Sequence, residues 1–77
     1  MHLDEGKTGQ TYIVESVELK LELERRLEAL GILPGTNVHI LNKKSHGALV
    51  IYVRGTRFAV GAGIARNILV KEALPHG

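Results

Sequence analysis

Cysteine is absent from this 77-residue chain, and so is tryptophan. Without a thiol the chain cannot form disulfides, thiolate metal sites, cysteine-ligated iron–sulfur clusters or a cysteine nucleophile. The lack of cysteine also fits a reducing compartment. A chain this short buries only a small hydrophobic core, so its stability is marginal unless a metal, a disulfide or a partner contributes.

Long apolar runs and a surplus of one charge are missing as well. No stretch approaches the roughly 18 apolar residues that suggest a membrane-spanning helix, and the polar start, MHLDEGKTGQ, is unlike a signal peptide. Ten Lys and Arg against eight Asp and Glu give a net charge of +2, too balanced to require nucleic acid as a partner. The hydrophobic content of 44% is that of a folded chain. We expect one cytoplasmic domain over residues 1–77.

Aromatic side chains are limited to Tyr12, Tyr52 and Phe58. Proteins that bind single-stranded nucleic acid stack bases on exposed aromatic side chains, and proline-rich peptides dock in aromatic-lined grooves. The scarcity argues against both roles. Five cations could still form a basic patch, although Lys and Arg also discourage pairing at sheet edges; they are Lys43, Lys44, Arg54, Arg57 and Arg66. On balance we expect no nucleic-acid partner.

Catalytic and metal-binding patterns are not visible either. None of the histidines has a second histidine or a carboxylate at ligand spacing; they are His2, His39, His46 and His76. No Ser or Thr stands in a nucleophile elbow, and the glycines match neither GxxxxGK[ST] nor GxGxxG. A solvated helix face explains the glutamates between residues 15 and 28. We therefore predict no enzyme, no cofactor and no metal site, and an iron-binding chaperone would need ligands that the chain does not show.

The stretch that organises the rest of the chain is residues 23–35, LERRLEALGILPG. Leucines recur there at spacings of four and three, which places them on one face of a helix; they are Leu23, Leu27 and Leu30. The segment just before, ELKLEL, suits a strand by its alternation and a helix by its residue types. We predict that the helix begins between Leu19 and Leu21.

Glycine and proline predict how this helix ends. Gly31 follows the last leucine, where a left-handed residue commonly closes a helix, and glycine adopts that conformation without a Cβ clash. Pro34 cannot continue the helix because it lacks an N–H and has a fixed φ. Pro34 and Gly35 suit the two central positions of a type II turn. The helix should therefore end at Gly31, and the chain should turn sharply into a strand.

Strand-like segments occupy most of the remaining chain. The five predicted strands are residues 11–17, 36–43, 48–54, 57–60 and 67–71. Gly55 and Thr56 are expected to turn the third strand back, and residues 61–66 to form a single helical turn before the fifth. The pattern predicts a mainly β fold, a small five-stranded SH3-like barrel with one helix between the first and second strands. An OB-fold carries its helix later, between the third and fourth strands.

A set of short motifs runs in order from about Leu3 to Glu72. In the helix and after it the motifs are RRL at 25–27, LGI at 30–32, PGT at 34–36 and Val38; TYIVESV at 11–17, VRG at 53–55 and AxxIxV at 65–70 extend the set. The motifs together resemble the signature of the FeoA family, small bacterial accessory proteins of ferrous-iron transport.

The resemblance implies a cytoplasmic SH3-like domain that acts on the membrane transporter FeoB, whose cytoplasmic portion carries a GTPase domain. It links the chain to transition-metal transport only through that partner, and to the membrane only peripherally. Position by position, it implies a partner-binding surface at Arg25, Arg26, Leu27 and Leu30. It implies structural roles in the motif for Gly31, Pro34, Gly35 and Gly55.

Two segments depart from the family pattern. Between the second and third strands the family has a loop close to PLGDP, where this chain has KSHGA. After the fourth strand the family often has a run close to LRKEEA, where this chain has VGAGIA. If either segment contacts the transporter, this chain has lost those contacts or is a divergent paralogue.

A second reading keeps the barrel and changes the partner. The SH3-like domain at the C-terminus of iron-dependent repressors of the diphtheria-toxin class is similar, so a regulatory or nucleic-acid-binding small barrel is the alternative. A chain of 77 residues that starts at Met1 has no room for a helix-turn-helix and a dimerisation domain, which favours the free-standing accessory protein. An exposed sheet edge in so small a barrel also predicts weak self-association.

Overall fold

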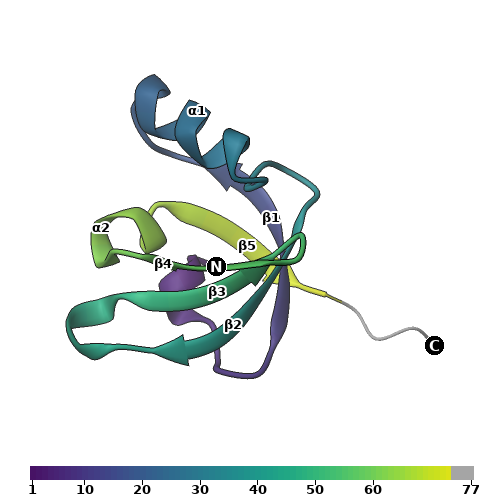
Figure 1. Cartoon of the computed structure of the whole chain (residues 1–77), viewed down its shortest axis with the longest axis vertical. Helices are drawn as coiled ribbons and strands as arrows, with labels where there is room; N and C mark the ends of the chain where they lie inside the picture. Colours follow the sequence, from purple (N-terminus) through teal and green to yellow (C-terminus); the bar gives the residue numbers. More distant parts are fainter. Residues whose placement is uncertain (74–77) are drawn as a thin grey trace.

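Five antiparallel strands form one curved sheet (Figure 1). In chain order they are β1 (Thr11–Val17), β2 (Asn37–Lys43), β3 (Leu49–Val53), β4 (Thr56–Val60) and β5 (Ile68–Glu72), and in space they lie in the order β4-β3-β2-β1-β5. Helix α1 (Leu21–Ala29) connects β1 to β2, and the single-turn α2 (Ala62–Ala65) precedes β5. This computed structural model describes residues 1–73. The mainly β fold and the places of both helices confirm the sequence prediction.

Alternation along the strands carries one set of side chains into a common core. The buried set draws on all five strands, on both helices, on the first 3-10 turn and on the connection after α1; it consists of Leu3, Tyr12, Val14, Leu27, Ile32, Val38, Ile40, Leu49, Ile51, Val53, Val60, Ala65, Ile68 and Val70. Within residues 1–73 no polar or charged side chain is buried. The barrel is therefore stabilised mainly by burial of apolar area, about 25 cal/mol per Å².

β1 joins the last strand of the chain, β5, to the rest of the sheet. Its first half pairs with β2, and it pairs with β5 with a register shift between Val14 and Ser16. A second shift, between Ile40 and Asn42, interrupts the pairing of β2 with β3. Bulges of this kind bend a strand and increase its twist. Five short strands can therefore curve around one core.

The first residues join the sheet. Leu3–Glu5 form one 3-10 turn in which Leu3 is fully buried. Ahead of this turn, the Val70 N–H donates to the Met1 carbonyl at 2.7 Å, and His2 forms an isolated bridge with Leu69. The start of the chain thus covers the outer edge of β5, and β4 remains as the edge strand. Self-association through that edge stays a prediction.

The end of α1 confirms the helix closure predicted at Gly31. The Ile32 N–H donates to the Leu27 carbonyl at 2.8 Å, and the Gly31 N–H donates to the Glu28 carbonyl at 2.9 Å. These two bonds form the Schellman motif, in which the first residue after the helix cap is left-handed. That residue is Gly31, whose φ is 97°. Ile32 and Leu27 are both buried, as the hydrophobic contact that accompanies this motif requires.

The turn after α1 is also as predicted. The Thr36 N–H donates to the Leu33 carbonyl at 3.1 Å, and Gly35 has φ of 91°, which defines a type II turn around Pro34 and Gly35. The turn is also bonded to β1, because the Gly35 N–H donates to the Val14 carbonyl at 2.8 Å. Helix end, turn and β1 are thus one hydrogen-bonded unit.

The turn between β3 and β4 differs from the prediction by one residue. Thr56 already belongs to β4, where it pairs with Val53, so the two turn residues are Arg54 and Gly55. Both have positive φ, 49° and 85°. This is the type I′ geometry that suits the twist of a two-residue hairpin. Glycine adopts it freely and arginine at some cost, which is why the sequence pattern did not indicate Arg54.

Replacing Gly31 with alanine should lower the free energy of unfolding more than the same change at Gly9. Both glycines have positive φ, 97° and 87°, so each alanine carries the left-handed cost of about 1–2 kcal/mol. At Gly31 the new Cβ would also lie 2.7 Å from Cδ of Arg54, whereas at Gly9 it would meet nothing within 4 Å. Urea unfolding measures both losses. Arg54→Ala should remove the excess, and equal losses in the two single variants would contradict the contact.

Candidate functional site

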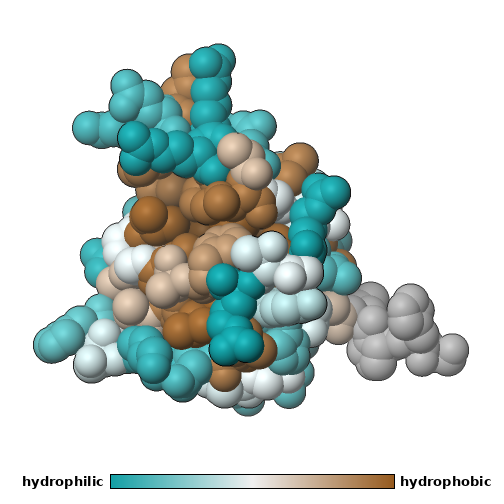
Figure 2. Space-filling view, in the orientation of Figure 1, coloured by the Kyte–Doolittle hydropathy of each residue, from teal (hydrophilic) through white to brown (hydrophobic). Residues whose placement is uncertain are grey.

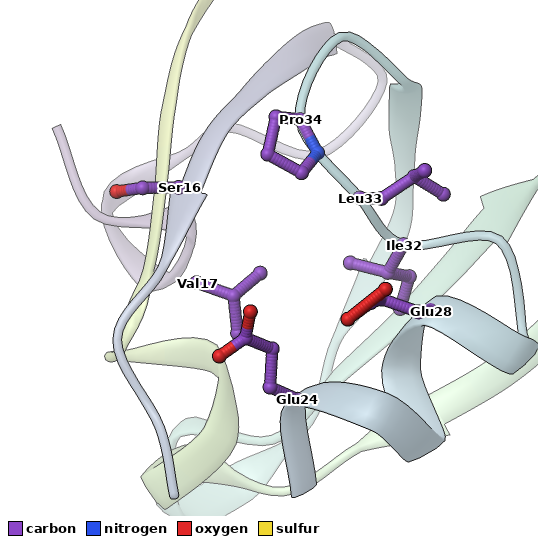
Figure 3. A pocket seen from close by; sticks show the side chains of 7 residues that line it. All are labelled: Ser16, Val17, Glu24, Glu28, Ile32, Leu33 and Pro34. Carbon is purple, nitrogen blue, oxygen red and sulfur yellow. The ribbon is translucent and has the colours of Figure 1, made fainter. Parts of the chain in front are cut away.

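A groove of about 260 Å³ separates α1 from the end of β1 and the chain that follows α1 (Figure 3). It is lined by Ser16 and Val17 of β1, by Glu24 and Glu28 of α1, and by the consecutive residues Ile32, Leu33 and Pro34. All three walls belong to the hydrogen-bonded unit that closes α1. The groove is therefore held by backbone bonds on each side.

The groove is apolar inside and acidic along one rim. Val17 contributes hydrocarbon to its interior, Pro34 lies across from the helix, and Ile32 lines the groove while being fully buried. Glu24 and Glu28 are four residues apart and share the groove-facing side of α1. In Figure 3 both carboxylates point into the hollow. Such a site can receive an apolar group together with a positive charge.

Helix α1 has an incompletely covered apolar surface. Leu27 is its only buried residue, at 5% exposure, and Leu23 is half-buried. Figure 1 shows α1 standing away from the sheet, and Figure 2 shows an apolar band where α1 meets the barrel. Partly buried apolar side chains pack against the core without being covered by it; they are Val17, Leu19, Phe58 and Ile64. Apolar area therefore remains open where α1 meets the barrel.

The predicted partner-binding residues fall into two environments. Arg25 and Arg26 are exposed, and so is Leu30, at 50%. Leu27 is buried and faces the barrel instead. Leu30 does not share the buried face with Leu27, because it caps the helix and the chain bends at the next residue. A partner can therefore touch the two arginines and Leu30, while Leu27 positions the helix that carries them.

The predicted structural residues meet although they are distant in the chain. Gly31, Pro34 and Gly35 form the connection after α1, and Gly55 lies in the β3–β4 turn. Arg54, next to Gly55, lies over Gly31, since its Cδ is 2.7 Å from where a Cβ of Gly31 would be. The β3–β4 turn thus packs against the end of α1.

Sequence reasoning missed the two groove carboxylates. It assigned the glutamates of this region to a solvated face, which holds for the exposed Glu28, whereas Glu24 is half-buried. Both carboxylates line the groove. The available signal was their spacing of four residues beside Leu23 and Leu27. The position of the opposite wall, Pro34 and the end of β1, could not be read from that spacing.

Other polar side chains in the described part of the chain make only structural contacts. Oγ1 of Thr11 and Nδ1 of His39 lie 2.8 Å apart across β1 and β2. No group of three or more His, Cys, Asp or Glu residues within residues 1–73 is arranged to hold a metal ion. His76 lies outside the described residues. No helix in the same range has the length and hydropathy needed to cross a membrane.

Five antiparallel strands around one core, with a helix after the first strand and a helical turn before the last, define the class as a small SH3-like β-barrel. Within that class the chain belongs to the FeoA family, because the FeoA domain model matches residues 1–72. The resemblance found in the sequence motifs is thereby confirmed.

Two relatives and one further structure place the chain among known proteins. A Methanocaldococcus jannaschii protein with the provisional name Fe(2+) transport protein A is 28% identical over 68 residues, 88% of this chain and 82% of the relative. The zinc-complexed FeoA of Stenotrophomonas maltophilia is 33% identical, with a TM-score of 0.78 over 92% of this chain and 89% of that one. It is described as a prokaryotic SH3-domain protein and a candidate activating factor of ferrous-iron transport.

The further structure shares the fold alone. A manganese-dependent transcriptional repressor matches with a TM-score of 0.84 at 17% identity. The match covers 96% of this chain but 41% of the repressor. The same barrel therefore occurs as one part of a larger regulator, as the sequence analysis anticipated.

Truncating Leu27 and Leu30 should separate the structural leucine from the exposed one. Leu27→Ala removes a buried side chain and should cost about 2–4 kcal/mol of unfolding free energy, whereas Leu30→Ala should cost less than about 0.5 kcal/mol. Urea unfolding of both variants measures this. Similar losses would mean that Leu30 packs against the barrel in solution and does not form part of an open surface.

Proposed function

We propose that this chain is a non-enzymatic, cytoplasmic accessory domain of ferrous-iron uptake, which binds and modulates a FeoB-type transporter. The observation that carries the proposal is membership of the FeoA family over residues 1–72. The names of the archaeal relative and of the S. maltophilia protein refer to the same transport process. The chain then acts beside the membrane, through its partner.

The surface of α1 supports a protein partner. Leu21 and Leu30 are exposed by 59% and 50%, and the arginines between them present charge without an aromatic platform. Large exposed leucines close to an incompletely covered apolar band are typical of protein-binding surfaces. Arginine is also enriched in such interfaces. We place the partner-binding surface on Arg25, Arg26 and Leu30, with Leu27 beneath it.

The attachment of α1 explains how docking can be transmitted. A nine-residue helix is marginal by itself in water. It is held here through Leu27 and through the hydrogen bonds that lock its C-terminal end to β1. A partner that grips α1 therefore grips the whole barrel. In this proposal the chain modulates the transporter by docking as a rigid body on the transporter's cytoplasmic part.

Removing the exposed side chains of α1 should weaken binding to the transporter. The variant Arg25→Ser/Arg26→Ser/Leu30→Ser removes two charges and one exposed leucine, and we expect about a tenfold or greater loss of affinity, since few residues carry most of an interface's energy. The matched control is Lys43→Ser/Lys44→Ser/Leu41→Ser, which likewise removes two positive charges and one exposed leucine, here from β2 and the residue after it. Binding to the FeoB-type transporter in nanodiscs is measured for both variants.

The outcomes of this experiment are distinct. Loss in the α1 variant alone supports the proposal, provided that its urea midpoint shows a folded protein. Equal binding by all three proteins would move the interface away from α1. Absence of binding by the unmodified chain would contradict the proposed function itself.

A nucleic-acid-binding role is the second candidate, and it draws on the fold shared with the manganese-dependent repressor and on the basic side chains. Lys43, Lys44, Arg54, Arg57 and Arg66 are exposed. Tyr52 is the single aromatic residue with large exposure, 46%, within residues 1–73. One stacking platform is a weak basis for binding single strands. We expect no mobility shift of DNA or RNA at low salt, and a shift that falls steeply with salt would favour this alternative.

A further inference from the structure

We propose that the groove beside α1 binds an apolar side chain of the protein partner that has a Lys or Arg next to it, with Glu24 and Glu28 receiving the cation. This inference rests on the proposed function and specifies the chemistry of the partner segment. It concerns the face of α1 turned toward β1 and Pro34, which the sequence motifs did not single out.

The size and shape of the groove select a side chain as its occupant. Its volume is about 260 Å³, below the range of about 300–1,000 Å³ typical of sites for cofactors and drug-sized ligands. Val17 presents hydrocarbon to it and Pro34 adds an apolar wall opposite the helix, while Ile32 belongs to the lining but is fully buried. One or two apolar side chains of a peptide fit such a site.

The charge of the groove selects the neighbouring residue. Glu24 and Glu28 are one helical turn apart, and neither takes part in the side-chain hydrogen bonds found within residues 1–73. Glu24 is half-buried and Glu28 is exposed, so both carboxylates are accessible to a cation on a bound segment. This acidic rim contrasts with the net charge of +2 of the whole chain. A basic residue is therefore attracted to these two carboxylates.

A metal ion is a poor occupant by comparison. Within residues 1–73 no third His, Cys, Asp or Glu joins the two glutamates to complete a metal-ligand set. A Lys or Arg side chain brings an alkyl stem for the apolar walls and a charged end for the carboxylates. An apolar residue followed by a Lys or Arg therefore fits both the apolar walls and the carboxylates of the groove.

The walls are ordered before any partner arrives. Ile32 is fixed by its N–H bond to Leu27 at 2.8 Å, and the turn containing Pro34 is fixed by the Gly35 N–H bond to Val14 at 2.8 Å. A preformed groove loses little conformational entropy on binding, so more of the contact energy appears as affinity.

Neutralising the two carboxylates tests the inference. The variant Glu24→Gln/Glu28→Gln keeps size and hydrogen bonding and removes both charges. Its matched control is Glu22→Gln/Glu72→Gln, which removes two exposed charges and, like the test variant, takes one from the first turn of α1. At low ionic strength we expect about tenfold weaker binding to the FeoB-type transporter for the groove variant and less than about twofold for the control. In about 1 M salt the difference should shrink.

A pair of short peptides tests the groove without the transporter. Acetyl-Gly-Leu-Lys-Gly-amide and acetyl-Gly-Leu-Gln-Gly-amide differ only in the charge next to the leucine. In NMR titrations of the full chain, the lysine peptide should shift the amide signals of Val17 and Ile32 more strongly than the glutamine peptide. Glu24→Gln/Glu28→Gln should abolish that difference. Equal shifts from both peptides in the unmodified chain would overturn the inference.

The two experiments separate this inference from the proposed function. Transporter binding that is unchanged in Glu24→Gln/Glu28→Gln overturns the inference and leaves the proposed function intact. No transporter binding by the unmodified chain overturns the proposed function, and the inference about its partner falls with it. Selective loss in the groove variant, together with charge-dependent peptide shifts, supports both.

Discussion

Two backbone hydrogen bonds at the end of α1 are the constraint on which the rest of the structure depends. They run from the Ile32 and Gly31 N–H groups to the carbonyls of Leu27 and Glu28, and they require a left-handed residue, which glycine supplies. Once they form, Ile32 enters the core and the turn at Pro34 is directed toward β1. The groove, the exposed flanks of the helix and the contact with Arg54 all follow from that single closure.

The same closure explains why so little of α1 is buried. A helix attached at its C-terminal end needs one anchor, Leu27, and its remaining turns are free to face solvent or a partner. Burying more leucine would stabilise the barrel by about 1.5–3 kcal/mol for each side chain. Leu21 and Leu30 remain exposed instead. The free energy that burying these leucines would add to folding can instead contribute to binding, and functional surfaces commonly lower stability in this way.

The helix end could be predicted from neighbouring residues in the sequence. Contacts between segments that are distant in the sequence could not. The helix end and the type II turn were predictable because Gly31, Pro34 and Gly35 each have conformations set by their own covalent structure. The strands were predictable from alternation to within one or two residues. The Arg54–Gly31 contact, the cover of β5 by Met1 and the groove depend on how distant segments pack. A spacing of four residues places Glu24 and Glu28 on one side of a helix, but it does not say what faces them.

The barrel alone does not determine what the protein binds. A manganese-dependent repressor contains the same fold at 17% identity, so recognition must reside in what differs on the surface. On this chain α1 carries Glu24 and Glu28 on its groove side, and Arg25 and Arg26 as exposed residues. A helix with opposite charges on different sides can accept a partner in one orientation and disfavour the reverse, because the reverse would bring like charges together. The charge on α1 therefore differs from one side of the helix to another, while the barrel positions the helix.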